Sequence, residues 1–349
     1  MKRFRIAIAG CGLIANEWVK YALTREDVEI VALVDVNNKN AKAMAQKYQL
    51  NCECYEDIED AIRSTGANLV FDTTIVMAHK DIVVKSIKAG CDVFGEKPMA
   101  FTMEEAVEMV STAAKYGKVY SVMQNRRFTK GLRAIRQLID SGALGKASFV
   151  CADIFVPADL KSIRNFLENP MLQDNAIHTF DQARFITGMD AISVYCHNFS
   201  PEGNKYKGHA AAECIFELSD GSVFSFRGWM GAEGCHTSWE SAWRIACSKG
   251  TLIWDGFSDP YYEIPLSENE KNSLTDDYKG LKAKSNWNGK LQHEGCLEEM
   301  FTALIEGRKA ETDCIDNIRS MAMVFAAIKS FKEERKVKII IKNGCPHFE

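Results

Sequence analysis

The first third of the chain alternates short apolar runs with segments of helical periodicity. The apolar runs are continuous and end at polar residues or glycines, which is typical of strands buried on both faces of a sheet. They are residues 4–9, 29–34, 68–72, 91–95 and 119–123. Between them, helical spacing predicts helices near residues 38–48, 57–64, 80–89 and 102–116. Strict alternation of strands and helices predicts an α/β domain with a doubly wound parallel sheet.

The pattern changes after residue 123. An amphipathic helix runs through Leu132, Ile135 and Leu138 and ends at Gly142. Long strand-like runs follow at residues 147–155, 191–199, 210–218, 222–229 and 242–247. Asp220-Gly221, between two of these runs, is a strong hairpin signal. With helices expected near residues 173–187, 293–306 and 313–332 and a strand at 337–341, this half is predicted to be α+β with a mainly antiparallel sheet.

Length, charge and cysteine usage narrow the class. A chain of 349 residues exceeds what one core usually organises, so we expect two domains, at residues 1–123 and 124–349. The net charge of −4 gives no indication of nucleic-acid binding. We expect no signal peptide and no membrane segment, because no apolar run is long enough. The 12 cysteines lack framework spacing, which favours reduced thiols and a cytoplasmic location. Cys52-x-Cys54 has no second pair nearby, so no metal site is expected.

A glycine turn follows the first strand. Gly10-Cys11-Gly12-Leu13-Ile14-Ala15 reads G-x-G-x-x-A between a strand and the start of a helix. Gly10 permits the tight turn, Gly12 lets backbone approach a pyrophosphate, and Ala15 allows close packing of the helix on the strand. The amide groups at Leu13 and Ile14, at the helix start, then face the phosphates. The motif alone is weak, because glycine turns after strands are common.

The second strand strengthens this interpretation. It ends at Asp35, about 20 residues after the glycines, where a carboxylate can bind both ribose hydroxyls. The same carboxylate repels a 2′-phosphate, so NAD is favoured as the cofactor. Lys39 would partly offset that repulsion, so the use of NADP stays open.

A polar tripeptide ends the strand at residues 91–95. Glu96 and Lys97 leave the carboxyl end of this strand, which is the edge where ligands bind in open α/β sheets. Pro98 biases Lys97 toward an extended backbone and so fixes the direction of its side chain. The lysine can serve as a point charge for an anionic group or as a proton donor. The alternative is a surface lysine in a turn.

Three polar residues share helical spacing in the second half. Asp174, His178 and Asp181 are expected on one face of the helix at residues 173–187. A carboxylate one turn from a histidine can orient the imidazole and raise its basicity, as in general-base pairs. The alternative is a solvated polar face with an aspartate near the helix N-terminus.

Taken together, these residues resemble the Gfo/Idh/MocA oxidoreductase family, the relatives of glucose-fructose oxidoreductase and inositol dehydrogenase. The resemblance covers nearly the whole chain. It rests on the glycine turn, Thr74 with His79, the A-G-x-x-V-x-x-E-K-P block ending at Pro98, Arg127-Phe128, and Asp174-x-x-x-His178, which come in the family's order.

The resemblance implies a Rossmann domain followed by an α/β domain with an open sheet, whose exposed face commonly pairs subunits. A homo-oligomer, dimer or tetramer, is therefore expected. It also implies that Lys97, Asp174 and His178 are catalytic: Lys97 hydrogen-bonds the reacting oxygen, His178 takes the hydroxyl proton, and Asp174 orients substrate or histidine. Cofactor binding is assigned to Gly10, Gly12, Leu13, Ile14, Asp35, Thr74, His79, Glu96, Lys97, Gln124 and Arg127.

Some positions depart from the family's pattern or stay open. Ile75 stands where the family often has Pro or Asn, and the residues flanking Asp174 also differ. Arg126 and Arg127 are each open to cofactor, substrate or a carboxylate in the helix below. Substrate contacts are assigned to Asp153, His236 and Trp239, since the segment around the last two is aromatic and polar enough for a sugar site.

The leading hypothesis is an NAD(P)-dependent dehydrogenase, or a reductase in reverse, acting on a CH–OH group of a sugar, cyclitol or polyol derivative. A second hypothesis is an enzyme that cleaves glycosides through transient oxidation by bound NAD. A third is a non-catalytic sensor or regulator on the same scaffold, against which the presence of Lys97 and His178 counts. The particular substrate, the direction of reaction and the subunit count do not follow from the sequence.

Overall fold

The computed structural model describes residues 3–160, 163–267, 277–342 and 344–349. Its chain forms two compact units. The first comprises Met1–Asn125 and Lys290–Met321, and the second comprises Arg126–Gly289 and Ala322–Glu349. The first boundary lies close to the predicted one, but residues 290–321, which the sequence assigned to the second domain, belong to the first unit.

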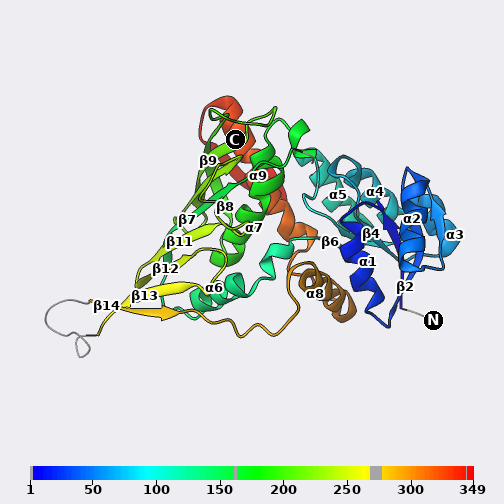
Figure 1. Cartoon of the computed structure of the whole chain (residues 1–349), viewed down its shortest axis with the longest axis horizontal. Coiled ribbons are helices and arrows are strands. Elements are labelled where there is room, and N and C mark those ends of the chain that lie inside the picture. Colours follow the sequence, from blue (N-terminus) through cyan, green and yellow to red (C-terminus); the bar gives the residue numbers. More distant parts are fainter. Residues whose placement is uncertain (1–2, 161–162, 268–276, 343) are drawn as a thin grey trace. The chain divides into compact units, whose positions relative to one another are not determined.

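The first unit is built on a six-stranded parallel sheet (Figure 1). Its strands are β1 (Phe4–Ala9), β2 (Val28–Val34), β3 (Glu53–Tyr55), β4 (Leu69–Asp72), β5 (Asp92–Gly95) and β6 (Tyr120–Val122). The order β3-β2-β1-β4-β5-β6 is that of the Rossmann fold, so the predicted fold class is confirmed. All four residues of β4 are buried, which agrees with a strand covered on both faces. Only β3 was not predicted.

Helices connect these strands. They are α1 (Ala15–Leu23), α2 (Asn38–Tyr48), α3 (Ile58–Thr65), α4 (Val76–Lys88) and α5 (Met103–Tyr116). Local signals fix their ends: the Asp57 side chain caps the first amides of α3, and Thr102 and Glu105 form a capping box on α5. Helix α4 begins earlier than predicted, at Val76.

A late segment returns to the first unit through aromatic packing. Helix α8 (Gln292–Glu306) places Phe301 against Phe94, with ring centroids 5.3 Å apart, and against Phe4 at 5.2 Å. Trp18 packs edge-on against Phe71 in the same cluster. Buried aromatic contacts contribute strongly to a core. They explain why residues 290–321 join the Rossmann unit, although nothing in their own periodicity signals it.

The second unit contains a ten-stranded sheet with the order β14-β13-β12-β11-β7-β10-β9-β8-β15-β16. Its central strands are β7 (Ala147–Val156), β8 (Ala191–Phe199), β9 (Ala211–Leu218), β10 (Val223–Met230) and β11 (Ala242–Cys247). The others are β12 (Gly250–Trp254), β13 (Tyr261–Pro265), β14 (Tyr278–Lys282), β15 (Val337–Lys342) and β16 (Cys345–Phe348). The pairing is antiparallel except that β7 and β10 run parallel. The hairpin predicted at Asp220-Gly221 joins β9 to β10.

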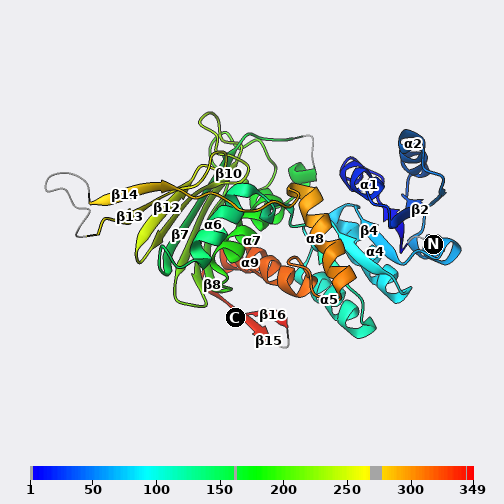
Figure 2. The same cartoon turned by 90° about the horizontal axis from the view of Figure 1, so that it is seen from below.

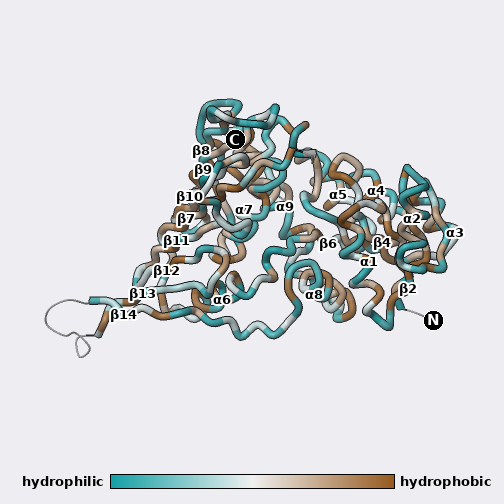
Figure 3. Tube along the Cα trace, in the orientation of Figure 1, coloured by the Kyte–Doolittle hydropathy of each residue, from teal (hydrophilic) through white to brown (hydrophobic). Residues whose placement is uncertain are grey.

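Helices cover one face of this sheet (Figure 1, Figure 2). They are α6 (Lys130–Asp140), α7 (Ala176–Thr187) and the later part of α9 (Cys314–Glu333). Short helical turns also occur at Asn125–Arg127, Ile163–Phe166 and Met171–Asn175. Phe180 of α7 lies 4.8 Å from Phe216 and 5.1 Å from Phe226, measured between ring centroids. Figure 3 shows hydrophobic stretches along the strands of this sheet, as expected for its packed face.

The opposite face of the sheet carries no helix in the described chain and exposes large side chains. Tyr195, Ile215, Ile253 and Tyr261 are 48%, 49%, 40% and 36% exposed. Tyr195 pairs in register with Ile215, and Ile253 with Tyr261. We call this surface the open face.

Candidate active site

The turn between β1 and α1 is shaped for close approach of an anionic ligand. Gly10 has φ +86°, and a Cβ there would lie 2.6 Å from the Thr73 carbonyl oxygen. Only glycine therefore fits against the end of β4. At Gly12 a Cβ would meet no protein atom within 4 Å. In the described chain, the backbone N–H groups of residues 12–15 donate no hydrogen bond, so they and the α1 dipole can bind phosphate oxygens.

Asp35 is held beside this turn, at the end of β2. Its Oδ2 accepts a hydrogen bond from the Cys11 N–H at 2.9 Å, and its Oδ1 accepts one from the Asn37 N–H at 2.8 Å. The carboxylate is thus fixed next to the glycine turn while part of it remains exposed. This is the arrangement that binds the ribose hydroxyls of a dinucleotide.

A buried aspartate organises the end of β4. Asp72 accepts hydrogen bonds from the Thr74 hydroxyl at 2.6 Å and from the Thr74 N–H at 3.1 Å, and its Oδ2 lies 2.7 Å from His79 Nδ1. Burial alone would lower the pKa of His79, but the Asp72 carboxylate raises it, and the net direction is upward. His79 is 2% exposed. It therefore positions the Thr74 loop through Asp72 and presents almost no surface to a ligand.

Glu96 and Lys97 follow β5, at the edge of the sheet that also carries the glycine turn and the Thr74 loop. The buried Glu96 carboxylate accepts hydrogen bonds from the Trp18 indole N–H at 2.8 Å and from the Lys97 backbone N–H at 3.1 Å. His293 of α8 places its Nε2 4.0 Å from the same carboxylate. These contacts fix the backbone from which the Lys97 side chain, half-buried, extends.

Gln124, just after β6, carries an orphaned buried group. It is 1% exposed, and its side-chain Nε2 has no hydrogen-bond acceptor within the described chain. A buried amide donor without an acceptor costs free energy, so a ligand that supplies one would bind here. Strands β1, β2, β4, β5 and β6 end at the same edge of the sheet. This edge carries the glycine turn, Asp35, Thr74, Glu96, Lys97 and Gln124, so it fits a dinucleotide.

The helix predicted at residues 173–187 differs in the structure. Met171–Asn175 forms a π-helical turn, and α7 begins only at Ala176. His178 and Asp181 are 5% and 1% exposed, so the alternative of a solvated polar face is wrong. The expected α-helical spacing of four between Asp174 and His178 is not kept, because Asp174 lies in the π-helical turn before α7. Asp174 and Asp181 also bind two different arginines.

Asp174 is held by an arginine that the sequence did not single out. Arg164 Nε donates to Asp174 Oδ2 at 2.6 Å, and Arg164 Nη1 lies 3.4 Å from Asp159. The Arg164 guanidinium also lies 5.8 Å from the centre of the Trp239 ring. Asp174 is therefore oriented before any ligand binds, and the Trp239 ring lies close to the arginine that holds it.

Asp181 is bound by Arg127. Arg127 Nε and Nη2 donate to the two Asp181 oxygens at 2.7 and 2.6 Å, and both side chains are buried. Two of the three guanidinium nitrogens are thus bound to a carboxylate of the same unit. The structure therefore favours the alternative that Arg127 binds a carboxylate in the helix below, and it does not support a cofactor role for Arg127.

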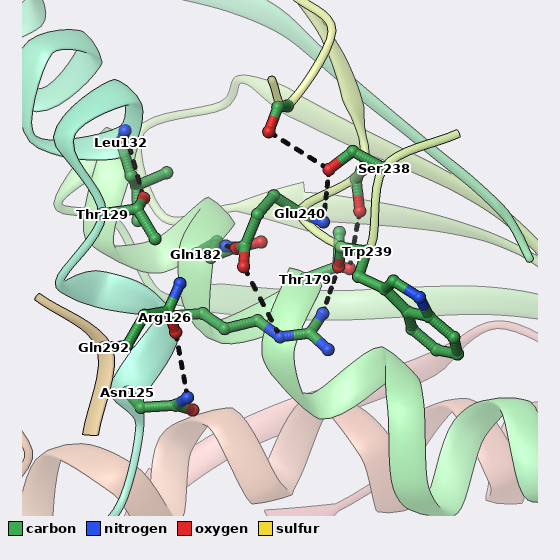
Figure 4. Close-up of polar contacts among 12 residues, drawn as sticks. Asn125, Arg126, Thr129, Leu132, Thr179, Gln182, Ser238, Trp239, Glu240 and Gln292 are labelled. Atoms are coloured by element: carbon green, nitrogen blue, oxygen red, sulfur yellow. Dashed lines mark hydrogen bonds and ion pairs between the residues drawn. The ribbon is translucent and has the colours of Figure 1, made fainter. Parts of the chain in front are cut away.

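Arg126 has different surroundings from its neighbour (Figure 4). Its Nη1 donates to the Trp239 carbonyl oxygen, and its Nε lies 3.9 Å from Glu240. Glu240 in turn accepts a hydrogen bond from Gln182 Nε2 at 2.7 Å. Burial lowers the pKa of Arg126, while Glu240 and Asp174 oppose that shift.

One expected substrate residue lies on the other side of the sheet, and another makes a contact within its own loop. Asp153 is on β7 and pairs with Arg227 at 2.6 and 2.8 Å on the open face, whereas its neighbours Ala152 and Ile154 face the helices. Asp153 is therefore on the opposite side of the sheet from α7, and the structure does not bring it to His178. His236 lies in the exposed loop after β10, where its Nε2 is 2.8 Å from the Ala232 carbonyl oxygen.

The residues that sequence reasoning missed act through tertiary contacts. They are Trp18, Asp72, Arg164, Gln182, Glu240 and His293. Asp72 could have been noticed as an acidic residue ending a strand two residues before Thr74. Over the described residues, no group of three or more His, Cys, Asp or Glu side chains could hold a metal ion.

Comparison with known proteins agrees with this fold and this edge. Residues 4–124 match the oxidoreductase family with an NAD-binding Rossmann fold, and residues 132–253 match the GFO/IDH/MocA C-terminal domain. The chain belongs to the Gfo/Idh/MocA family of oxidoreductases and is an NAD-binding protein. The resemblance and the cofactor predicted from the sequence are confirmed.

Two dehydrogenases match this chain over a little more than half of their own length. The chain is 30% identical to the D-glucoside 3-dehydrogenase of Escherichia coli over 58% of this chain and 59% of that one. It is 30% identical to the inositol 2-dehydrogenase of Ralstonia nicotianae over 54% and 56%. An oxidoreductase from Agrobacterium radiobacter, solved with NAD⁺, L-tartaric acid and magnesium, has the same fold, with a TM-score of 0.82, 21% identity and coverage of 96% and 98%. In the part of the chain that the structure describes, no helix is long and apolar enough to cross a membrane.

Proposed function

We propose that this protein is an NAD-dependent dehydrogenase, or a reductase in the reverse direction, that acts on a CH–OH group of a sugar, cyclitol or polyol derivative. The observation that carries the proposal is that Glu96 and Lys97 end β5 at the edge that also holds the glycine turn, Asp35 and Gln124. A cation at this edge suits a reacting oxygen beside a dinucleotide. The names of the E. coli and R. nicotianae relatives support the substrate class.

The cofactor would be held by groups that lack protein partners or are fixed toward it. The N–H groups of residues 12–15 would bind the pyrophosphate, Asp35 the ribose, and Gln124 a polar group near the end of β6. Thr74 is oriented by Asp72, with His79 behind it. When bound, NAD supplies the hydride acceptor. The carboxylate of Asp35 favours NAD over NADP, because it would repel a 2′-phosphate.

Three side chains are proposed to act at the carbinol. Lys97 donates a hydrogen bond to the reacting oxygen and stabilises its developing negative charge. His178 takes the hydroxyl proton as the C–H bond breaks. Asp174, fixed by Arg164, orients a substrate hydroxyl or the histidine.

We also propose that the open face pairs with a second copy of this chain. Its exposed aromatic and aliphatic side chains, among them Tyr195, Ile215 and Ile253, extend across neighbouring strands. Large apolar side chains exposed on one face of a sheet often mark an interaction site. A monomer in light scattering would count against this part of the proposal without affecting the chemistry.

The test is a screen of sugars, inositols and sugar acids with the purified full chain, with NAD and NADP in parallel. The proposal predicts NADH formation with at least one compound and weaker use of NADP. Release of an aglycone from a glycoside without net NADH would instead identify transient oxidation. Binding of NAD without turnover of either kind would point to a regulator.

A further inference from the structure

The Arg126 guanidinium is shielded from solvent, but no carboxylate of the described chain lies close enough to balance its charge well. Its side chain is 15% exposed, and its closest acceptor is the neutral carbonyl oxygen of Trp239. The only carboxylate within 4 Å in the described chain is Glu240, at 3.9 Å from Nε. No hydrogen bond from Nη2 is found in the same residues, and Figure 4 draws none. A shielded guanidinium in this state has unmet hydrogen-bonding capacity.

Other arginines of the second unit show how different this is. Each of the following has a carboxylate oxygen between 2.6 and 2.9 Å from a guanidinium nitrogen: Arg127 with Asp181, Arg164 with Asp174, Arg184 with Asp190, and Arg227 with Asp153. These four guanidinium groups each have a close carboxylate, which Arg126 lacks among the described residues. Because Arg126 has no such close carboxylate in the described part of the protein, it is free to bind an acidic group of a ligand.

Glu240 is held back from closing on Arg126. Its Oε2 accepts from Gln182 Nε2 at 2.7 Å, and its backbone N–H donates to Ser238 Oγ at 2.7 Å. Gln182 is fully buried on α7, so this anchor is rigid. The second terminal nitrogen of Arg126 thus stays available while the arginine itself is fixed through the Trp239 carbonyl.

The surroundings of Arg126 also suit the rest of a sugar-like ligand. Trp239 is 39% exposed, and its ring lies beside the Arg164 guanidinium. An indole surface packs well against the C–H groups of a sugar ring. Asp174, neutralised by Arg164, is an acceptor for a hydroxyl group.

We propose that the substrate of this enzyme is a hydroxy acid of the sugar type, such as a uronate or aldonate, whose carboxylate pairs with the guanidinium of Arg126 while Trp239 packs against its carbon skeleton. A planar guanidinium with free N–H groups is the side chain best matched to a carboxylate. The inference rests on the proposed function for its redox chemistry, but the binding contact can be measured separately.

The experiment compares matched acid and neutral ligands on the full chain saturated with NAD. The pairs are D-glucuronate with D-glucose, D-galacturonate with D-galactose, and D-gluconate with D-glucitol. Binding is read from quenching of tryptophan fluorescence, and turnover is read from NADH formation. We expect the wild type to prefer the acid of at least one pair by at least about tenfold, which is about 1.4 kcal/mol.

Variants assign that preference to Arg126. Arg126→Gln should abolish the preference by weakening the acid about tenfold or more while leaving its neutral partner and NAD nearly unchanged. Arg126→Lys keeps the charge but loses the planar donor pair, so its preference for the acid should lie between those of the wild type and Arg126→Gln. The control is Arg63→Gln, which removes the same charge from an exposed position in the first unit. If Arg126→Gln does not fold, the acid preference of the wild type and its reduction in Arg126→Lys still test the inference.

Each outcome separates this inference from the proposed function. Acid binding that depends on Arg126 without any NADH formation supports the inference and contradicts the dehydrogenase. Turnover of a neutral polyol with no preference for any acid overturns the inference and leaves the dehydrogenase intact. Loss of NAD affinity in Arg126→Gln with an unchanged acid preference also overturns it, because Arg126 would then serve the cofactor. Absence of acid binding altogether overturns it too.

Discussion

The guanidinium of Arg127 binds the carboxylate of Asp181 through two hydrogen bonds of 2.7 and 2.6 Å, at 6% and 2% side-chain exposure. The pair joins the segment after β6 to the buried helix α7, which also carries His178. Arg126, the adjacent residue of the same type, makes no such pair. Two neighbouring arginines therefore have separate tasks, one in the fold and one available for a ligand.

Removing one partner of the buried pair should destabilise the second unit strongly. Arg127→Ala leaves the Asp181 carboxylate buried without its cation, which typically costs about 3–5 kcal/mol. Urea unfolding of the full chain measures this loss. Lys329→Ala, which breaks a partly exposed pair with Glu333 one helical turn away, should cost about 1 kcal/mol or less. Equal losses in the two variants would contradict a structural role specific to Arg127.

The two glycines of the turn after β1 should respond differently to alanine. In Gly10→Ala the added Cβ meets the Thr73 carbonyl oxygen in a left-handed backbone, so stability should fall by at least about 1–3 kcal/mol. In Gly12→Ala the Cβ meets no protein atom, so stability should stay within about 1 kcal/mol of wild type. NAD affinity should nevertheless fall about tenfold or more, because the methyl group occupies the approach of the pyrophosphate. Unfolding curves and NAD titration measure the two effects; unchanged NAD binding in Gly12→Ala would argue against the phosphate site.

Asp35→Ala should weaken NAD more than NADP, because it removes an acceptor for ribose hydroxyls and a group that repels a 2′-phosphate. Titration of both dinucleotides measures the ratio of their affinities. The variant also frees the Cys11 N–H, so some affinity for both should be lost. The ratio is therefore the informative quantity, and an equal loss for both dinucleotides would contradict the ribose role.

His79 should make the stability of the first unit depend on pH. Its pKa is raised in the folded protein, so the pair with Asp72 contributes stability that is fully present below the unfolded pKa of about 6.5. That contribution is lost as the pH rises through the folded pKa. The difference in unfolding free energy between wild type and His79→Asn should therefore shrink with rising pH above 6.5. A difference that grows with pH would mean that the imidazole is neutral in the folded state.

The sequence predicted what local patterns determine. The apolar runs of the first half, the glycine turn at Gly10 and the hairpin at Asp220-Gly221 depend on neighbouring residues, and all three were confirmed. The return of α8 to the first unit was not predictable, because it depends on Phe301 meeting Phe94 and Phe4 across long sequence distances.

The candidate site was predictable in part for the same reason. Sequence motifs identified Lys97, Asp174 and His178. The residues that hold them in place lie far away in the chain or in loops without a sequence pattern. Arg164 is an example, since it holds Asp174 from a segment with no readable periodicity. The fates of Arg126 and Arg127 could not be told apart in sequence, because only the positions of Asp181 and Glu240 in space distinguish them.

The central claim is that the Lys97 ammonium stabilises the reacting oxygen of a substrate oxidised by NAD. The most direct measurement is the rate of NADH formation by Lys97→Ala with a substrate of the wild type, together with the NAD affinity of the variant. Lys88→Ala, an exposed lysine at the end of α4, serves as the matched control. We predict that Lys97→Ala abolishes turnover with NAD affinity within a few fold of wild type and that Lys88→Ala keeps both. Normal kcat in Lys97→Ala would contradict the account.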